Sequence, residues 1–313
     1  MTRTLVAGGA GFVGSHLVDA LIARGDDVVV VDDLCTGTRA NLDHLGDQVE
    51  FVQADIADAA ALETGLRGEF DRVFNLASPA SPIDYYERPI ETMMTGALGG
   101  KNLLDLSRRW GARYLLASTS EVYGDPLVHP QTEAYLGNVN PIGPRAVYDE
   151  AKRFGEAMAA SYRREWDVDV AIIRIFNTYG PRMRANDGRA IPNFVAQALA
   201  GDPITVAGDG SQTRSICFVT DLVRGIIAMM DSGEFGPVNL GNPIEISMLD
   251  LATWIRDLIG SASQITFIDR PVDDPELRRP DISLAAQALG WAPEVSAEEG
   301  LRETIESFRA RLS

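Results

Sequence analysis

The feature of this sequence that most constrains its fold is the spacing G-x-x-G-x-x-G, formed by Gly8, Gly11 and Gly14. They directly follow the short apolar run 4–7 and precede the amphipathic stretch 15–24. Glycines permit a tight turn between a strand and a helix, and they let a pyrophosphate approach the backbone amides at the helix N-terminus. Because a glycine pattern alone also suits an ordinary tight turn, the neighbouring segments decide the interpretation.

Short apolar runs alternate with longer amphipathic stretches throughout the first half of the chain. The runs lack polar alternation, which is typical of strands buried on both faces of a parallel sheet. They cover residues 4–7, 28–31, 51–52, 73–76, 114–117 and 168–176, and helix-like stretches such as 58–66 and 92–110 lie between them. This repetition predicts right-handed crossovers and an α/β fold with a Rossmann-type, doubly wound parallel sheet.

The pattern loosens after residue 176. Residues 177–189 are rich in Gly, Pro and Arg, and they are followed by short strand candidates at 204–207, 216–219 and 237–240 and helix candidates at 191–200, 248–259 and 298–311. The length of 313 residues suits two domains. We predict a dinucleotide-binding domain over 1–175 and a smaller C-terminal α/β substrate domain over 176–313, with segments near 217–242 returning to the first domain.

The charge balance excludes several classes of partner. The chain has 28 Lys and Arg against 45 Asp and Glu, a net charge of −17. Such a surface repels phosphate backbones and anionic lipids, so we expect no nucleic-acid or membrane partner. No apolar run reaches the roughly 18 residues of a membrane span, and the first strand begins too early for a signal peptide. A small anionic substrate is still possible, because a few local arginines can outweigh a distant net charge.

Cysteine and histidine usage gives no sign of a disulfide framework or a metal site. Cys35 and Cys217 are far apart in the sequence, and the three histidines, His16, His44 and His129, are scattered. Two unclustered cysteines fit a reducing compartment, so we predict a cytoplasmic protein without a metal.

Acidic residues follow the second and third strand candidates. Asp32 stands where a carboxylate can accept hydrogen bonds from the adenosine ribose hydroxyls and repel a 2′-phosphate, which favours NAD over NADP. Asp33 also suits a solvated loop. Asp55 and Ile56 would flank the adenine, although Asp55 equally suits a helix N-cap.

Two further groups of polar residues indicate proton transfer. Tyr148 and Lys152 are spaced i, i+4 and share one helix face, where a lysine and a positive nicotinamide would favour a phenolate able to deprotonate a hydroxyl. The spacing also occurs by chance on many helices. Thr119, Ser120 and Glu121 follow the buried strand 114–117, at the edge where such sheets place ligands. A Ser/Thr helix cap is the alternative there.

Together with the glycine turn and Asp32, residues 119–126 (TSEVYGDP) and 148–152 (YDEAK) resemble the extended short-chain dehydrogenase/reductase superfamily. A closer resemblance, to UDP-glucuronate decarboxylases (UDP-xylose synthases), rests on residues 76–82 (LASPASP), 140–145 (NPIGPR), 174–182 (RIFNTYGPR), 210–214 (GSQTR) and 278–282 (RRPDI). It covers nearly the whole chain. It implies that NAD oxidises C4 of UDP-glucuronate, that the β-keto acid loses CO₂, and that re-reduction yields UDP-xylose.

The resemblance also separates this reaction from its neighbours. Related UDP-sugar 4-epimerases carry Ser or Thr in place of Glu121, and 4,6-dehydratases carry an Asp-Glu pair in place of Ser120 and Glu121. Decarboxylases carry Thr-Ser-Glu, as here, and an arginine matching Arg278. An epimerase or a dehydratase is the alternative enzyme, and a catalytically silent NAD sensor is the alternative of another class.

The superfamily's site residues carry over by position. The implied catalytic residues are Thr119, Ser120, Glu121, Tyr148, Lys152 and Arg278. The implied cofactor-binding residues are Gly8, Gly11, Phe12, Val13, Asp32, Asp33, Thr36, Gly37, Asp55, Ile56, Leu76, Ala77, Ser78, Thr95, Ala117, Tyr148, Lys152 and Thr178. The implied substrate-binding residues are Tyr85, Thr119, Glu121, Asn177, Asn193, Arg214 and Arg278.

Some positions keep two interpretations. Arg145 and Arg182 suit either anion contacts or structural charges, Arg278 and Arg279 could be solvated or simple phosphate contacts, and Tyr85 could be a core residue. Gly96 replaces an Asn of the family's helix, which costs helix propensity and would loosen the nicotinamide end. The resemblance further implies a homodimer through the helices 92–110 and 148–164.

Overall fold

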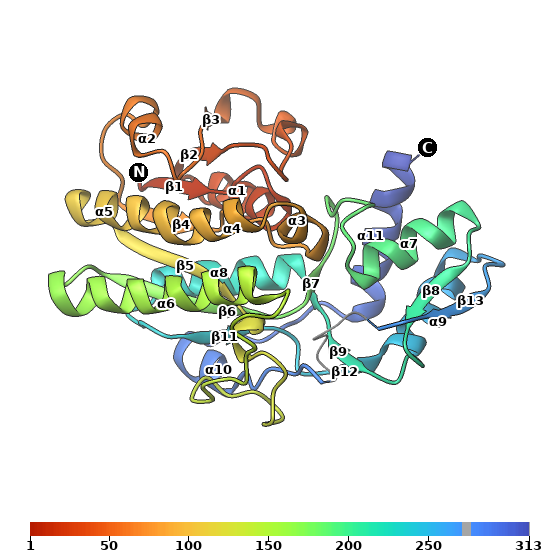
Figure 1. The fold of residues 1–313 in the computed structure, drawn as a ribbon. Helices are drawn as coiled ribbons and strands as arrows, with labels where there is room; N and C mark the ends of the chain where they lie inside the picture. The colour runs from red at the N-terminus through yellow and green to blue at the C-terminus, as the bar shows by residue number, and fades with distance from the viewer. Residues whose placement is uncertain (271–276, 313) are drawn as a thin grey trace.

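The larger part of the molecule is a seven-stranded parallel sheet with the helices that cover its two faces (Figure 1). The computed structural model describes residues 1–270 and 277–312. The strand order of the sheet is β11-β6-β5-β4-β1-β2-β3, and every neighbouring pair is parallel. The strands are β1 (Arg3–Ala7), β2 (Asp27–Asp32), β3 (Val49–Gln53), β4 (Arg72–Asn75), β5 (Arg113–Thr119), β6 (Val170–Ile175) and β11 (Val238–Leu240). The predicted doubly wound sheet is therefore confirmed.

Alternate side chains of each strand enter two separate cores, one on each face of the sheet. On β2, Val28 and Val30 pack on one face, while Val29 and Val31 pack on the other, and none is more than 1% exposed. Helices α1 (Phe12–Arg24) and α8 (Val219–Asp231) cover the first face; α2 (Ala59–Gly65), α5 (Gly100–Trp110) and α6 (Ala146–Trp166) cover the second. Burial on both faces explains why these strands read as continuous apolar runs.

The predicted helix 92–110 is interrupted by a π-helical turn. It begins as α4 (Pro89–Met94), passes through η3 (Thr95–Gly99) and continues as α5. A Cβ atom on Gly96 would lie 3.0 Å from the Ala151 Cβ on α6. Gly96 thus permits a close approach between η3 and α6. The glycine lowers the helix propensity of this segment, but it also allows the two helices to pack together.

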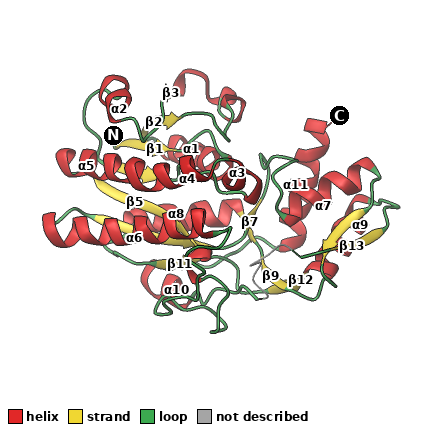
Figure 2. Ribbon diagram, in the orientation of Figure 1, coloured by secondary structure: helices red, strands yellow, loops and turns green. Residues whose placement is uncertain are grey.

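The second part of the chain lies to one side of the main sheet (Figures 1 and 2). It contains α7 (Ala190–Ala200), α9 (Met248–Ile259) and α11 (Ala297–Leu312), with the parallel pair β8 (Ile204–Ala207) and β13 (Ile265–Ile268). The sequence did not predict several short elements, namely η1 (Arg39–Asn41), η2 (Asp43–Gln48), α3 (Pro82–Glu87), η4 (Ser120–Tyr123), β7 (Thr178–Tyr179), β9 (Thr213–Ser215), β12 (Glu245–Ser247) and α10 (Ser283–Leu289).

A long excursion separates β11 from the strand that it pairs with. The sequence predicted a strand at 216–219, but only β10 (Cys217–Phe218) is extended, and α8 begins at Val219. Helix α8 packs against α1, and β11 pairs with β6 at the sheet edge. The structure thus places residues 219–231 and 238–240 with the main sheet, and the boundary at 175/176 stays a prediction. No helix in the described ranges combines the length and apolarity of a membrane span.

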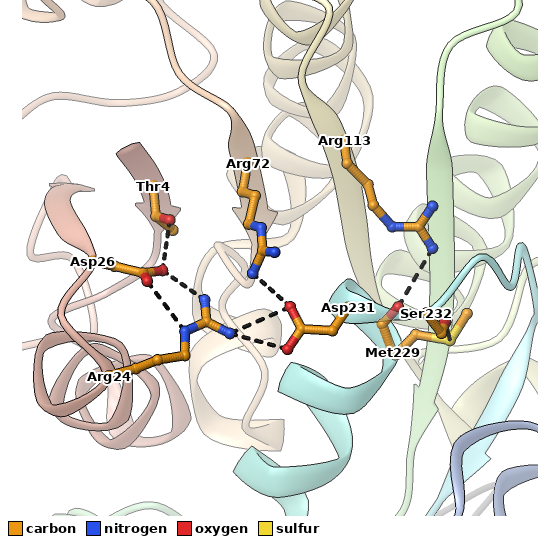
Figure 3. Close-up of polar contacts among 8 residues, drawn as sticks. All are labelled: Thr4, Arg24, Asp26, Arg72, Arg113, Met229, Asp231 and Ser232. Carbon is orange, nitrogen blue, oxygen red and sulfur yellow. Dashed lines mark hydrogen bonds and ion pairs between the residues drawn. The ribbon is translucent and has the colours of Figure 1, made fainter. Parts of the chain in front are cut away.

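An ion cluster joins α8 to the amino ends of the strands (Figure 3). The Asp231 carboxylate, at the end of α8, binds Arg72 Nη1 on β4 at 2.6 Å and Arg24 Nη1 on α1 at 3.1 Å. Arg24 Nη2 in turn binds the Asp26 carboxylate at 2.6 Å, and Asp26 accepts a hydrogen bond from Thr4 Oγ1 on β1. One carboxylate therefore connects three elements.

Asp231→Asn should lower the free energy of unfolding by about 1 kcal/mol, because Asp231 is 44% exposed and water screens its ion pairs. Urea denaturation measures the loss, and added salt should shrink it. Glu63→Gln, which breaks a single exposed pair with Arg109, is the control and should cost less. A salt-independent loss would contradict an electrostatic role for Asp231.

Candidate active site

The glycine turn forms a cradle at the start of α1. Gly8 has a φ of +79°, and a Cβ there would lie 2.8 Å from the Ala77 backbone nitrogen. A Cβ on Gly14 would lie 2.1 Å from the Gly8 carbonyl oxygen. Helix α1 follows the N-cap Gly11, and no side chain caps its first amides. The glycines therefore let the turn pack closely against neighbouring backbone, and the uncapped amides at the start of α1 are donors for an anionic group such as a dinucleotide pyrophosphate.

Asp32, at the end of β2, connects this turn to the following loop. Its Oδ2 accepts a hydrogen bond from Ala10 N at 3.0 Å, and its Oδ1 accepts one from Leu34 N at 2.8 Å. The side chain is buried, and burial raises its pKa above the usual value against the effect of these two hydrogen bonds. Each oxygen keeps a lone pair that can accept a ribose hydroxyl.

Most residues predicted to bind the cofactor line one pocket beside the glycine turn. They are Gly8, Gly11, Phe12, Val13, Asp32, Asp33, Thr36, Asp55, Ile56, Leu76, Ala77, Ser78 and Thr95. Gly37 lies behind the turn, where a Cβ would be 2.9 Å from the Ala10 carbonyl carbon. Ala117 and Thr178 are not in this lining: the Ala117 oxygen accepts a hydrogen bond from Lys152, and Thr178 Oγ1 donates to the Phe176 oxygen.

Arginines from the second part of the chain complete the pocket wall. Arg184, Arg189 and Arg311 line it, and sequence reasoning did not select them. Arg182 lines it as well. Its guanidinium binds the Asp19 carboxylate at 2.7 Å, which agrees with the alternative that Arg182 is a structural charge. The only sequence signal was the richness of 177–189 in arginine, which does not say where the side chains point.

Tyr148 and Lys152 lie on one face of α6, as their spacing predicts. Lys152 Nζ is 5.7 Å from the centre of the Tyr148 ring and donates to the Ala117 oxygen at 2.9 Å. Burial lowers the pKa of Lys152 to about 8. Burial, and then Glu121, raise the pKa of Tyr148 although its hydrogen bond with Thr119 acts the other way. In the protein alone, burial therefore outweighs the Thr119 hydrogen bond and keeps the phenol protonated.

Tyr85, on α3, stacks on Tyr148. Their ring centroids are 5.3 Å apart, with an interplanar angle of 9°. Tyr85 is 2% exposed, and its hydroxyl is buried without a hydrogen-bond partner among the described residues. A core tyrosine packed for shape alone would not need this hydroxyl. It is available to a ligand that reaches Tyr148.

Glu121 lies between two arginines. Arg278 Nη1 contacts its Oε1 and Arg145 Nη2 its Oε2. Burial alone would raise the pKa of Glu121, but Arg278 and then Arg145 outweigh it and lower the pKa to about 2. Arg278 is 3% exposed and also donates to the Gly124 oxygen at 3.2 Å. Arg145 and Arg278 are therefore not solvated surface charges.

Asp149 is a buried carboxyl that sequence reasoning missed. Burial, then the nearby Glu121, raise its pKa to about 7. Its Oδ1 is buried without a partner among the described residues. The signal was its place directly after Tyr148 in a helix that also carries Lys152, but a helical acid is usually solvated.

The other predicted residues come from several elements. Ser120 is buried in η4, where Thr119 Oγ1 accepts a hydrogen bond from Glu121 N at 3.2 Å, so the predicted cap alternative is also present. Asn177 follows β6 and leaves its Nδ2 buried and unpartnered among the described residues. Asn193 lies on α7, and Arg214 lies on β9 and donates to the Thr213 oxygen. No group of three or more potential metal ligands occurs in the ranges 1–270 and 277–312.

Lys152→Met measures the effect of burial on this ammonium group. Between pH about 8 and the ordinary lysine pKa of 10.5, the unfolded chain binds more protons than the folded one. The stability of the parent protein relative to the variant should therefore rise with pH across this window, by at most about 3 kcal/mol. Urea denaturation at a series of pH values provides the measurement. A flat difference for Lys152 would contradict its burial.

Comparison with known proteins identifies the family. A model of the family described as GDP-mannose 4,6 dehydratase matches residues 5–304. UDP-glucuronic acid decarboxylase 1 of Arabidopsis thaliana is 50% identical over 312 residues, which cover 99% of this chain and 70% of the relative.

Solved structures agree. A dTDP-glucose 4,6-dehydratase from Streptomyces venezuelae with NAD bound is 30% identical with a TM-score of 0.90, over 99% of this chain and 97% of the other. The UDP-glucuronic acid 4-epimerase of Bacillus cereus, in complex with UDP-glucuronic acid and NAD, is 26% identical with a TM-score of 0.88, over 99% and 100%. The chain thus belongs to the UDP-glucuronic acid decarboxylase family, within the extended short-chain dehydrogenase/reductase superfamily.

Proposed function

We propose that the protein decarboxylates UDP-glucuronate to UDP-xylose with NAD as a recycled cofactor. The observation that carries this proposal is the Glu121 carboxylate held between Arg145 and Arg278 beside Tyr148. An epimerase needs only an oxidised C4, whereas a decarboxylase must also release the substrate carboxylate as CO₂ and protonate the carbanion left at C5. The 50% identity to named decarboxylases over 99% of the chain supports the same choice.

The residues present fit NAD. The cradle of Gly8 and Gly14 has no space for a Cβ, and the amides at the start of α1 are uncapped, which suits a pyrophosphate. Asp32 suits an adenosine ribose with free hydroxyls and disfavours a 2′-phosphate. When bound, NAD⁺ supplies a hydride acceptor for C4 of the sugar and later returns the hydride.

Tyr148 is the proposed base for the 4-hydroxyl. The positive charge of Lys152, and that of the nicotinamide, oppose the effect of burial and favour the phenolate. Thr119, which already hydrogen-bonds Tyr148, would bind the same oxygen of the sugar. Tyr148 then holds the proton while C4 is a ketone, and it returns the proton to the oxygen at the end.

Loss of CO₂ follows from the ketone. The C5–C6 bond breaks, its electron pair moves through C5 onto the C4 oxygen, and CO₂ leaves. Tyr148 and Thr119 stabilise the resulting enolate by hydrogen bonds. A solvent proton then adds to C5 in place of the carboxyl group, and we assign the positioning of its donor to the ionised Glu121 with Ser120. Arg278 receives the substrate carboxylate, since its buried Nε has no partner among the described residues.

The remaining contacts are assigned to the nucleotide sugar. Tyr85 and Asn177 present unpartnered polar atoms toward a ligand, and Asn193 and Arg214 would contact the diphosphate part. Residues 176–313, less the segments packed on the sheet, would form this nucleotide-sugar domain.

We further propose a cytoplasmic homodimer. Met94 on α4, Leu98 on η3 and Phe154 on α6 are each about half exposed, at 45, 47 and 52%. Large apolar side chains on neighbouring helices favour burial against a second copy through these helices. The free thiols of Cys35 and Cys217 suit a reducing compartment.

Incubation with UDP-glucuronate separates the candidate functions. We expect a product lighter by CO₂ in the mass spectrum, without consumption of external NAD⁺. Unchanged mass with inverted C4 would indicate the epimerase, and loss of water from UDP-glucose would indicate the dehydratase. Bound NAD without turnover would favour the sensor.

Glu121→Gln should keep C4 oxidation and slow the completed reaction by about a hundredfold or more, because the substitution removes the carboxylate but keeps its shape. Rapid quenching and mass spectrometry should show the 4-keto sugar, while absorbance reports reduced cofactor. Glu165→Gln, at an exposed position on α6, is the control. Full activity of Glu121→Gln would refute this role.

A further inference from the structure

Residues 277–282, which carry Arg278, are held by the backbone and side chain of Gln131. Gln131 is fully buried. Its backbone N donates to the Arg279 oxygen at 2.9 Å, and its backbone oxygen accepts from Asp281 N at 2.8 Å. Its side-chain Oε1 accepts from Arg279 N at 2.9 Å. Three directional bonds therefore fix the chain immediately after Arg278.

Asn239, on the edge strand β11, connects Gln131 to the turn that carries Glu121. Its Nδ2 donates to the Gln131 oxygen at 3.0 Å and to the Asp281 oxygen at 3.1 Å. Its Oδ1 accepts from the hydroxyl of Tyr123 at 2.8 Å, and Tyr123 closes the η4 turn that contains Glu121. One fully buried amide thus contacts both segments that meet at the proposed reaction centre.

The hydrogen bonds of this amide fit in one orientation only. Its nitrogen faces two carbonyl oxygens, and its oxygen faces a hydroxyl donor. The Tyr123 hydroxyl is itself oriented, because it accepts from Arg174 Nη1 at 2.9 Å. Arg174 is opposite Asn239 in the β6–β11 pairing and binds the Glu156 carboxylate at 2.7 Å. The sheet thus fixes the amide, and the amide fixes the two segments.

The Glu121–Arg278 ion pair cannot set this geometry by itself. Coulomb attraction depends weakly on direction, whereas hydrogen bonds weaken steeply when they bend. Glu121 and Arg278 are 157 residues apart in the sequence, and the segment of Arg278 contributes no strand to the main sheet. Besides the ion pair, Arg278 has only two long hydrogen bonds among the described residues, one to the Gly124 oxygen at 3.2 Å and one from Ser215 N to its own backbone oxygen at 3.3 Å. Without Asn239 and Gln131, the arginine could therefore keep its ion pair and still shift relative to a bound sugar.

We propose that Asn239, acting through Gln131, is a positioning residue that sets the place of Arg278 relative to Glu121 and thereby favours loss of CO₂ over return of the hydride to an intact uronate. This inference rests on the proposed function. Decarboxylation is the step that needs Arg278, while C4 oxidation depends on Tyr148, Lys152 and Thr119. A displaced Arg278 should therefore slow the loss of CO₂ more than it slows the oxidation of C4.

Asn239→Leu and Gln131→Met test the proposal without changing the charge of the protein. In a single turnover with UDP-glucuronate labelled at C6, labelled CO₂ reports decarboxylation and absorbance of the reduced cofactor reports oxidation. The ratio of the two rates should fall about tenfold or more in both variants, since small displacements at a reacting centre cost large factors. A merely structural role would lower both rates together and leave the ratio unchanged.

Gln197→Met is the matched control. The Gln197 amide also makes two hydrogen bonds, donating to Thr205 Oγ1 at 2.9 Å and accepting from Thr205 N at 3.0 Å, and neither residue belongs to the proposed site. We expect a loss of stability with an unchanged ratio. If Asn239→Leu does not fold, Asn239→Ser replaces it, because serine can serve the Tyr123 hydroxyl but cannot reach both carbonyl oxygens.

A second readout needs no turnover. The Nε–H resonance of Arg278, assigned with Arg278→Lys, should shift in the Asn239 and Gln131 variants and stay in place in Gln197→Met. If the protein releases no CO₂ but this resonance shifts, the proposed function fails, and only the part of the inference by which Asn239 sets the place of Arg278 stands. If it releases CO₂ while ratio and resonance match the parent protein in both folded variants, the positioning role is overturned.

Discussion

The common direction of all seven strands determines where chemistry can occur in this molecule. Parallel strands bring their carboxyl ends to one edge, so the glycine turn after β1, Asp32 at the end of β2 and Glu121 just after β5 share that edge. The sheet is buried on both faces and leaves few other places for polar side chains. The second part of the chain closes the edge with Arg278 and the pocket arginines.

Burial raises the free energy of an ionised side chain, and in this site nearby charges of opposite sign offset that effect. The chain carries a net charge of −17, yet arginines surround Glu121. Burial alone would protonate Glu121, and two guanidinium groups keep it ionised. Asp149, nearby, has its pKa raised to about 7. Neighbouring carboxyls with opposite shifts are typical of sites that transfer protons.

The sequence predicted the elements with a strong local signal. Uninterrupted apolar runs marked the first six strands, and the glycine spacing marked the turn, because both patterns express local geometry. Helical spacing indicated Tyr148, a strand end indicated Glu121, and resemblance added Arg278; the structure brings the three near one another. The resemblance did not select Asp149, and it could not decide on Arg145, because their importance comes from contacts with Glu121 across the fold. Helix α8 and the π-helical turn also depend on tertiary packing against α1 and α6.

The position of β11, far after β6 in the sequence, has a consequence for biosynthesis. Strand β6 ends at Ile175, but its edge partner begins only at Val238. While a ribosome makes the intervening chain, the outer edge of β6 has no neighbour from its own molecule, and unpaired edges invite association with other chains. In that interval a nascent molecule presents the unpaired edge of β6. The amide of Asn239 enters together with this last strand, so catalytic competence cannot precede closure of the vulnerable edge.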